Sequence, residues 1–263
     1  VTQSGTQIIG GLTTIIATGK DVTLTDVSND FKNAVIIKGK DVEVVDGVAT
    51  GGSIGIDLGV STVTGTYSVT ALEGDVKDSG VLTIDGIATV LASTSNDQDI
   101  TLNSNNNFKS GIRLEGRNVV VKVASAASLI LGASSGTSTI TGWLKGTGVG
   151  NAVTDGGALS VAGTTNLLAT GQNVTFDHAS SNFQGELKIK GANVSVTHPT
   201  ELKLGVSTIS GTYAITTSAG NITDEGALAI TGASTFTTNG DGADIELNET
   251  TNKFTGTVTV NTV

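Results

Sequence analysis

The chain repeats itself nearly four times, and this internal repetition limits which folds it can adopt. Each copy opens with a polar turn that ends in glycine and precedes an apolar run, as in Asp78-Ser79-Gly80 before VLTIDGIATVLA. The turn glycines of the four copies are Gly5, Gly80, Gly157 and Gly226. Self-similarity at a fixed long period is typical of solenoid and array architectures. The long repeats therefore run approximately over residues 6–80, 81–157, 158–226 and 227–263, the last one truncated.

Aromatic residues follow the same repeat. A polar turn ends in phenylalanine once in each copy, at Phe31, Phe108, Phe183 and Phe254. An aromatic residue also follows a Thr/Ser-Gly turn in three copies, at Tyr67, Trp143 and Tyr213. We interpret the phenylalanines as a structural ladder that fills the core, because large apolar rings at one repeated corner need no ligand. For the other three residues, packing in the core or at an edge is favoured over an outward position suited to sugar stacking.

A shorter period of 20 residues runs inside each long unit. GKDVTLTD at Gly19 recurs as GKDVEVVD at Gly39, and GQNVTF at Gly171 recurs as GANVSV at Gly191. Short alternating strands separated by Gly, Asn and Asp turns at this spacing are typical of one coil of a parallel β-helix. We therefore expect an all-β parallel β-solenoid over residues 1–263, with about 20 residues per coil. An antiparallel sandwich or barrel is the alternative, but it gives no reason for the 20-residue offset.

Composition agrees with this fold and excludes several functions. The chain has 36 glycines, 37% hydrophobic residues, no cysteine and a net charge of −10. The acidic balance argues against nucleic acid as a partner, because binding to phosphates requires a basic surface. Without cysteine there is neither a disulfide framework nor a thiolate site. No apolar run is long enough for a membrane span, no signal peptide is visible, and the chain begins at Val1, so we expect part of a longer protein.

Two pairs of residues are weak candidates for metal sites. His178 and His198 are separated by 20 residues, so they would stack at one corner, as a metal pair or a pH-sensitive spot. Asp26 and Asp46 have the same separation, and stacked carboxylates suit Ca²⁺. Solvated turn residues are the commoner explanation for both pairs. We therefore expect no metal and no cofactor, with calcium as the candidate if one binds.

No catalytic residue stands out in the sequence. The enzymes that a β-helix most often carries, polysaccharide lyases and hydrolases, need clustered carboxylates with basic residues on adjacent coils. Arginine occurs only at Arg113 and Arg117, and no nucleophile lies in a pattern with a base. We therefore expect a protein that is not an enzyme, with a lyase or hydrolase as a remote alternative.

The order of motifs resembles a known group of bacterial proteins. The acidic turn, the N-x-F turn of NNNF, the GRNVVV strand and the SGTY turn are together similar to shaft repeats of filamentous-haemagglutinin-type exoproteins and related β-helical adhesins. That resemblance covers essentially the whole chain and implies a secreted protein displayed as a long fibre. The family's secretion domain carries an Asn-Pro-Asn signature, whereas the single proline here is Pro199 in HPTE. The chain thus resembles the shaft and not the secretion domain.

These observations lead to one main hypothesis and one alternative. The main hypothesis is a rigid shaft or fibre segment of an exported bacterial surface adhesin, which continues end to end with like coils or with a second copy. The alternative is a module that binds a host or matrix glycan through a solenoid face near Tyr67, Trp143 and Tyr213. Both place the chain outside the cell, with no nucleic acid and no membrane span.

Overall fold

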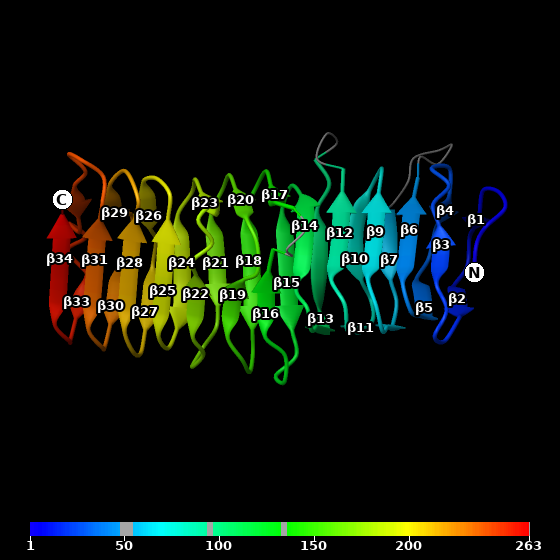
Figure 1. The fold of residues 1–263 in the computed structure, drawn as a ribbon, viewed down its shortest axis with the longest axis horizontal. Helices are drawn as coiled ribbons and strands as arrows, with labels where there is room; N and C mark the ends of the chain where they lie inside the picture. The colour runs from blue at the N-terminus through cyan, green and yellow to red at the C-terminus, as the bar shows by residue number, and fades with distance from the viewer. Residues whose placement is uncertain (48–54, 94–96, 133–135, 263) are drawn as a thin grey trace.

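The protein is a parallel β-solenoid, as the sequence predicts. The computed structural model describes residues 1–47, 55–93, 97–132 and 136–262. Its chain winds through about 12 turns of roughly 21 residues, without a helix in the described residues, and its two termini lie at opposite ends (Figure 1). Every strand pair in these residues is parallel. At about 4.8 Å per coil, the rod is about 60 Å long.

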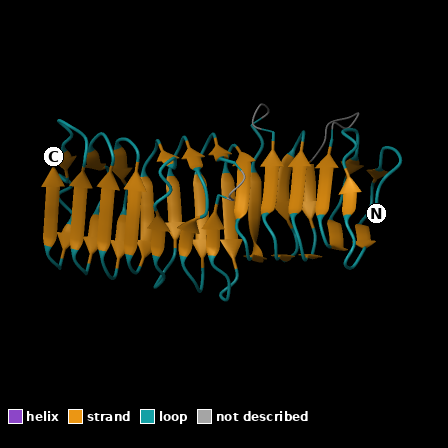
Figure 2. Cartoon of the chain, in the orientation of Figure 1, coloured by secondary structure: helices purple, strands orange, loops and turns teal. Residues whose placement is uncertain are grey.

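Two long sheets form opposite walls of the rod, and Figure 2 shows that loops and turns connect their strands. The 17-stranded sheet consists of β2 (Thr13–Ile16), β5 (Val35–Gly39), β7 (Gly55–Leu58), β8 (Ser61–Val63), β10 (Asp75–Asp78), β11 (Leu82–Ile84), β13 (Ile100–Phe108), β15 (Val119–Val123), β18 (Leu144–Gly148), β21 (Thr165–Leu168), β24 (Leu187–Gly191), β26 (Leu202–Leu204), β27 (Ser207–Ile209), β29 (Ile222–Asp224), β30 (Leu228–Ile230), β32 (Ile245–Glu246) and β33 (Lys253–Phe254). The 15-stranded sheet consists of β3 (Val22–Leu24), β6 (Val42–Asp46), β9 (Tyr67–Ala71), β12 (Ala88–Ala92), β14 (Ile112–Gly116), β16 (Leu129–Leu131), β17 (Ser138–Ile140), β19 (Val153–Asp155), β20 (Leu159–Val161), β22 (Val174–Phe176), β23 (Asn182–Phe183), β25 (Val194–His198), β28 (Tyr213–Thr217), β31 (Ser234–Thr238) and β34 (Val258–Thr262). A small third sheet pairs β1 (Ile8–Ile9) with β4 (Asp30–Phe31).

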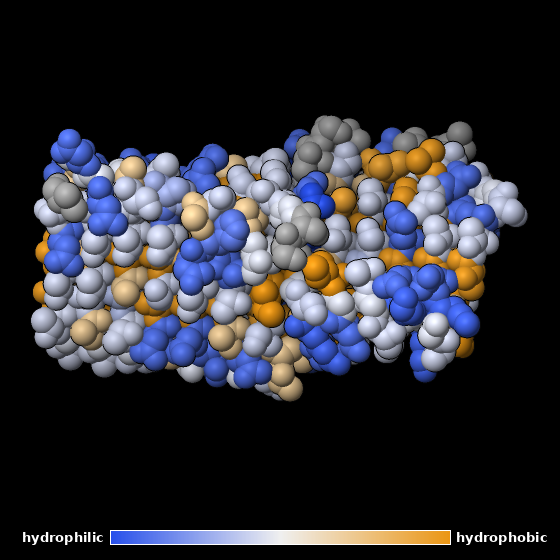
Figure 3. Space-filling model, in the orientation of Figure 1, coloured by the Kyte–Doolittle hydropathy of each residue, from blue (hydrophilic) through white to orange (hydrophobic). Residues whose placement is uncertain are grey.

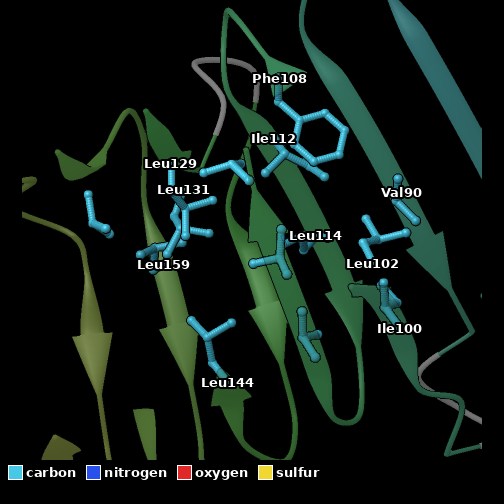
Figure 4. Close-up of a cluster of buried hydrophobic side chains, with 14 of the residues drawn as sticks. Val90, Ile100, Leu102, Phe108, Ile112, Leu114, Leu129, Leu131, Leu144 and Leu159 are labelled. Atoms are coloured by element: carbon cyan, nitrogen blue, oxygen red, sulfur yellow. The ribbon is translucent and has the colours of Figure 1, made fainter. Parts of the chain in front are cut away.

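Alternation of apolar and polar residues explains which side of each strand is buried. In β24, Leu187 and Ile189 are buried while Lys188 and Lys190 face out. Successive side chains of a strand point to opposite faces, so the inward set of every strand meets in one core between the two sheets. Figure 4 shows this core around Leu114 and Leu129, where aliphatic side chains from successive coils stack.

The long repeat spans three and a half coils. From β5, the 17-stranded sheet proceeds through three pairings, β5–β8, β8–β11 and β11–β13, before the chain crosses to β14 in the other sheet. At β5 and at β14, a five-residue strand gives way to a pair of short strands, and the same change occurs again at β24. Successive copies of the repeat are therefore rotated by half a coil, and equivalent residues lie on opposite walls of the rod.

Stacked glycines at the equivalent corner of each repeat copy allow the coils to approach closely. The amide of Gly232 donates to the carbonyl of Gly211, 3.0 Å away. A Cβ at Gly232 would lie 2.4 Å from that same carbonyl oxygen, so no larger residue fits without movement of the backbone. The same stacking recurs in each copy, for the pairs Gly65–Gly86, Gly142–Gly163, Gly163–Gly185 and Gly232–Gly256.

Candidate functional site

The acidic turn of the repeat is a buried hydrogen-bonding corner. The carboxylate of Asp78 ends β10 and accepts hydrogen bonds from the backbone amides of Asn103 and Ser104 in the next coil. It also accepts the side-chain amide of Asn106 at 2.6 Å. Because buried polar groups are costly without partners, this carboxylate serves to join two coils. The corresponding residues in the other copies are Gln3, Asp155 and Asp224.

The polar residue two positions before each repeated phenylalanine completes this corner, and sequence reasoning missed its role. The side-chain oxygen of Asn106 accepts a hydrogen bond from the backbone amide of Leu82 at 2.8 Å. It therefore forms a second link to the coil that contains Asp78. Its equivalents are Asn29, Ser181 and Asn252. The first two are completely buried, as is Asn106. The signal is present in the motifs SNDF, NNNF, SSNF and TNKF, whose polar residues are interpreted from the sequence only as a turn.

His198 is a buried structural residue. Its Nε2 accepts the backbone amide of Phe183 at 2.9 Å, and its Nδ1 lies 3.0 Å from the carbonyl oxygen of Thr200. Nδ1 therefore carries the proton and donates to Thr200, while the ring stacks on Phe183 with centroids 5.9 Å apart. Both ring nitrogens are occupied, so neither is available for a metal shared with His178. The Nδ1 of His178 instead accepts the backbone amide of Ser180.

Acid is expected to destabilise the protein through His198. Burial lowers the pKa of His198, and the hydrogen bond to Thr200 offsets this only in part. The unfolded chain then takes up a proton first, near pH 6.5, so the free energy of unfolding falls as the pH drops from there through the lower folded-state pKa. Urea midpoints between pH 7.5 and 5.5 should show this slope. His198→Asn should remove it and His178→Asn should retain it; a slope unchanged in His198→Asn would contradict the assignment.

Asp26 and Asp46 each accept a hydrogen bond from a different backbone segment. Asp46 is buried at the end of β6, and its Oδ1 accepts the amide of Phe31 at 2.9 Å, as His198 does for Phe183. Asp26 accepts the amide of Ser28 within its own turn. In the described part of the chain, no group of three or more His, Cys, Asp or Glu side chains is arranged to hold a metal.

The repeated phenylalanines fill the core but do not form one continuous ladder. Phe31, Phe108 and Phe183 are each about 1% exposed. The half-coil rotation places Phe183 in the 15-stranded sheet, whereas Phe108 and Phe254 lie in the 17-stranded sheet. Two of them contact other aromatic rings: Phe183 stacks on Phe176, and Phe254 meets Phe236 edge to face.

The expected equivalence of Tyr67, Trp143 and Tyr213 is wrong by one residue. Tyr67 and Tyr213 pair with Val42 and Val194 and are buried, and burial raises the pKa of both. The residue that pairs with Val119 at the same position is Leu144, so Trp143 stands one place earlier and is 43% exposed. The two tyrosines are therefore core residues, and only the tryptophan offers an aromatic surface.

Toward the C-terminal end of the 15-stranded sheet, the outer side is an uncharged surface rich in hydroxyl groups. From β25 to β34, its outward residues are small or hydroxyl-bearing, and Figure 3 shows a mostly pale surface over these strands. They form two columns along the rod, namely Ser195, Ala214, Thr235 and Thr259 in the first, and Thr197, Thr216, Thr237 and Asn261 in the second. Thr235 and Thr237, for example, flank the buried Phe236.

The outer side of the 17-stranded sheet differs because it carries lysines. In the described strands, all eight lysines belong to this sheet and none to the 15-stranded one. Four of them gather over the adjacent strands β15, β18, β21 and β24: Lys122, Lys145, Lys188 and Lys190. Sequence reasoning missed this surface, because the positions of single lysines gain meaning only once the walls are assigned.

Comparison with known proteins identifies a repeat family. A family model described as repeats of unknown function, DUF5649, matches residues 1–38, 45–115, 116–190 and 191–261. No curated protein and no solved structure matches the chain. These results support a repeat solenoid, and nothing in them connects it to filamentous-haemagglutinin-type exoproteins. In addition, the described residues contain no helix of the length and hydrophobicity that a membrane crossing requires.

Proposed function

The chain belongs to the DUF5649 family of repeats of unknown function, and on that premise we propose that it is a rigid, non-catalytic shaft segment of an exported bacterial adhesin or extracellular filament. Its coils would continue end to end with like coils and hold a distal binding region away from the cell. A solenoid suits this task because each coil contacts only its neighbours, so length is added without a change of fold.

The observation that carries the proposal is the parallel pairing that continues from coil to coil along both walls of the described chain and presents inward apolar side chains for a like coil to cover. In β34, Val260 lies above Phe236 on the inward side of the coil, yet it is 53% exposed. At the other end, a hollow of about 520 Å³ opens beside Leu12, Leu24 and Phe31. Unpaired strand edges with apolar side chains are templates for further pairing. A like coil paired to β34 would cover Val260.

A matched pair of variants in β34 tests end-to-end growth. We expect the chain to form filaments in electron micrographs at high concentration. Val260→Lys should abolish them, because it places a charge on the inward side of the end coil. Thr259→Lys adds the same charge to the outward side of the same strand and should leave filaments intact. Dispersed monomers in the unmodified chain, or equal assembly by both variants, would contradict end-to-end growth.

The location outside the cell needs a separate test. It is supported by the resemblance of the repeat motifs to exported shafts, and the absence of cysteine is compatible with it. Immunogold labelling of intact cells that produce the complete protein should place gold particles on the surface. Labelling only after permeabilisation would rule out display at the surface while leaving the rod architecture unaffected.

A further inference from the structure

The two walls of the rod provide an internal comparison of surface chemistry. Because successive repeats are rotated by half a coil, the same repeat position faces out on the 17-stranded sheet in one copy and on the 15-stranded sheet in the next. Lys122 of β15 is equivalent to Val45 and Thr197 on the other wall. Each of them lies three residues after an equivalent valine, namely Val119, Val42 and Val194. Folding alone therefore does not require lysine at this position.

The same comparison holds for the neighbouring strand. Lys145 of β18 corresponds to Ser68 and Ala214, and the exposed Trp143 corresponds to Thr66 and Thr212. In each copy the amide of the residue at the tryptophan position donates to an Asn or Asp side chain, so the backbone is equivalent. At these three positions, one wall carries a cation or an aromatic ring where the other carries a hydroxyl or alkyl group.

Two shallow hollows lie beside Lys188 and Lys190 of the same wall. One of about 250 Å³ is lined by Asn166, Leu168, Lys188, Lys190, Val206 and Thr208. The other, of about 140 Å³, lies on the far side of Lys190 against Gly191 and Ser210. The first combines an apolar floor with two ammonium groups, an amide and a hydroxyl. Val206 is 58% exposed, so this floor is open to solvent.

The lysines in this cluster are only partly neutralised by neighbouring acids. Within the cluster, Lys188 is 2.9 Å from Glu186. Exposed pairs of this kind are weak and leave the cation accessible to a stronger partner. On a chain of net charge −10, such a cluster is a local field of opposite sign.

From this wall we infer that the solenoid binds an acidic polysaccharide, a chain of carboxylate-bearing sugars lying along the rod over β18, β21 and β24. Its carboxylates would pair with Lys145, Lys188 and Lys190, while the C–H face of a sugar ring would contact Leu168 or Trp143. Strands two coils apart are about 10 Å apart along the axis, so one extended oligosaccharide reaches both ends of the cluster. Nucleic acid fits less well, because its dense phosphates would meet the overall negative charge.

Trp143 makes a direct test straightforward because it is the single tryptophan of the chain. Its fluorescence should change on titration with oligogalacturonate and stay constant with neutral dextran. Binding should weaken as sodium chloride is raised, because the contacts are ionic. If oligogalacturonate at low salt produced neither a fluorescence change nor a heat of binding, the inference would be overturned.

Charge-matched variants locate the site. The triple change Lys145→Gln, Lys188→Gln, Lys190→Gln should raise the Kd for oligogalacturonate by about tenfold or more. The triple change Lys38→Gln, Lys77→Gln, Lys253→Gln removes the same charge from the same sheet and should leave the Kd within about twofold. Circular dichroism and urea unfolding check that both variants fold. Equal losses in both, or tighter binding of a single-stranded oligonucleotide of equal charge, would overturn the assignment to an acidic polysaccharide.

Discussion

Replacing Phe183 by Ala is expected to lower the free energy of unfolding by about 3–5 kcal/mol. Phe183 is about 1% exposed and stacks between Phe176 and His198, with ring centroids 5.6 and 5.9 Å away. Truncation would leave a cavity in a rigid stack whose coils are held at fixed spacing by parallel hydrogen bonds, so the neighbours cannot close it. Urea unfolding followed by circular dichroism measures the loss.

The repeat supplies the control for this change. Phe254 occupies the same repeat position but is only partly buried in the last coil, so Phe254→Ala should cost clearly less. Because each coil contacts only its neighbours, amide exchange should also increase mainly in coils adjacent to Phe183. Equal losses from the two variants, or exchange that increases uniformly along the rod, would contradict this account of the core.

The length of a coil could be predicted because similar sequence motifs recur at that spacing. GQNVTF and GANVSV are offset by 20 residues, and Val174 indeed pairs with Val194. The half-coil rotation could not be predicted in the same way. An offset between copies shows that two segments are alike, but it does not show which wall each one occupies. Only the pairing of β14 with β12 on one side and with β16 and β17 on the other reveals the change.

The error at Trp143 shows how alignment by aromatic residues fails. TGTY and TGW share a Thr-Gly turn, and the residue that stacks from coil to coil is the glycine, not the ring. Counting from Gly65 and Gly142 makes Trp143 equivalent to Thr66, and Leu144 equivalent to Tyr67. Since side chains alternate with every residue, a slip of one position exchanges the core for the surface. The tight contact at the stacked glycines was therefore the better reference.

Buried polar residues were the least predictable part of the candidate sites. Histidine and aspartate in turn motifs are usually exposed. The 20-residue separation was the single basis for the prediction that His178 and His198 stack. In the structure, His198 and Asp46 instead cap the backbone amides of Phe183 and Phe31. Their shared task is visible only once the phenylalanine turn is known to fold back against the end of the following strand.

Replacing Asp78 by Ala is expected to cost about 2–4 kcal/mol, because several donors would lose a charged acceptor at once. The carboxylate is 8% exposed and accepts the amide of Asn103 at 2.8 Å and the side chain of Asn106 at 2.6 Å. Without it, the Asn106 side-chain amide stays buried next to a methyl group, although its carbonyl still accepts from Leu82. Asp78→Asn should also destabilise, because its NH2 group would face a donor in either orientation, the Asn106 side chain or the backbone amides of Asn103 and Ser104.

An exposed aspartate of the next turn separates this effect from a loss of charge. Asp85 pairs with Lys109 at the surface, 2.6 Å away, and surface ion pairs contribute at most about 1 kcal/mol. Asp85→Ala should therefore change the urea midpoint little, whereas Asp78→Ala should lower it strongly. A double variant, Asp78→Ala with Asn106→Ala, should cost less than the sum of the single changes, because the second removes the unpaired amide. Strict additivity would show that the two residues act separately, and the corner would not be the joint between coils.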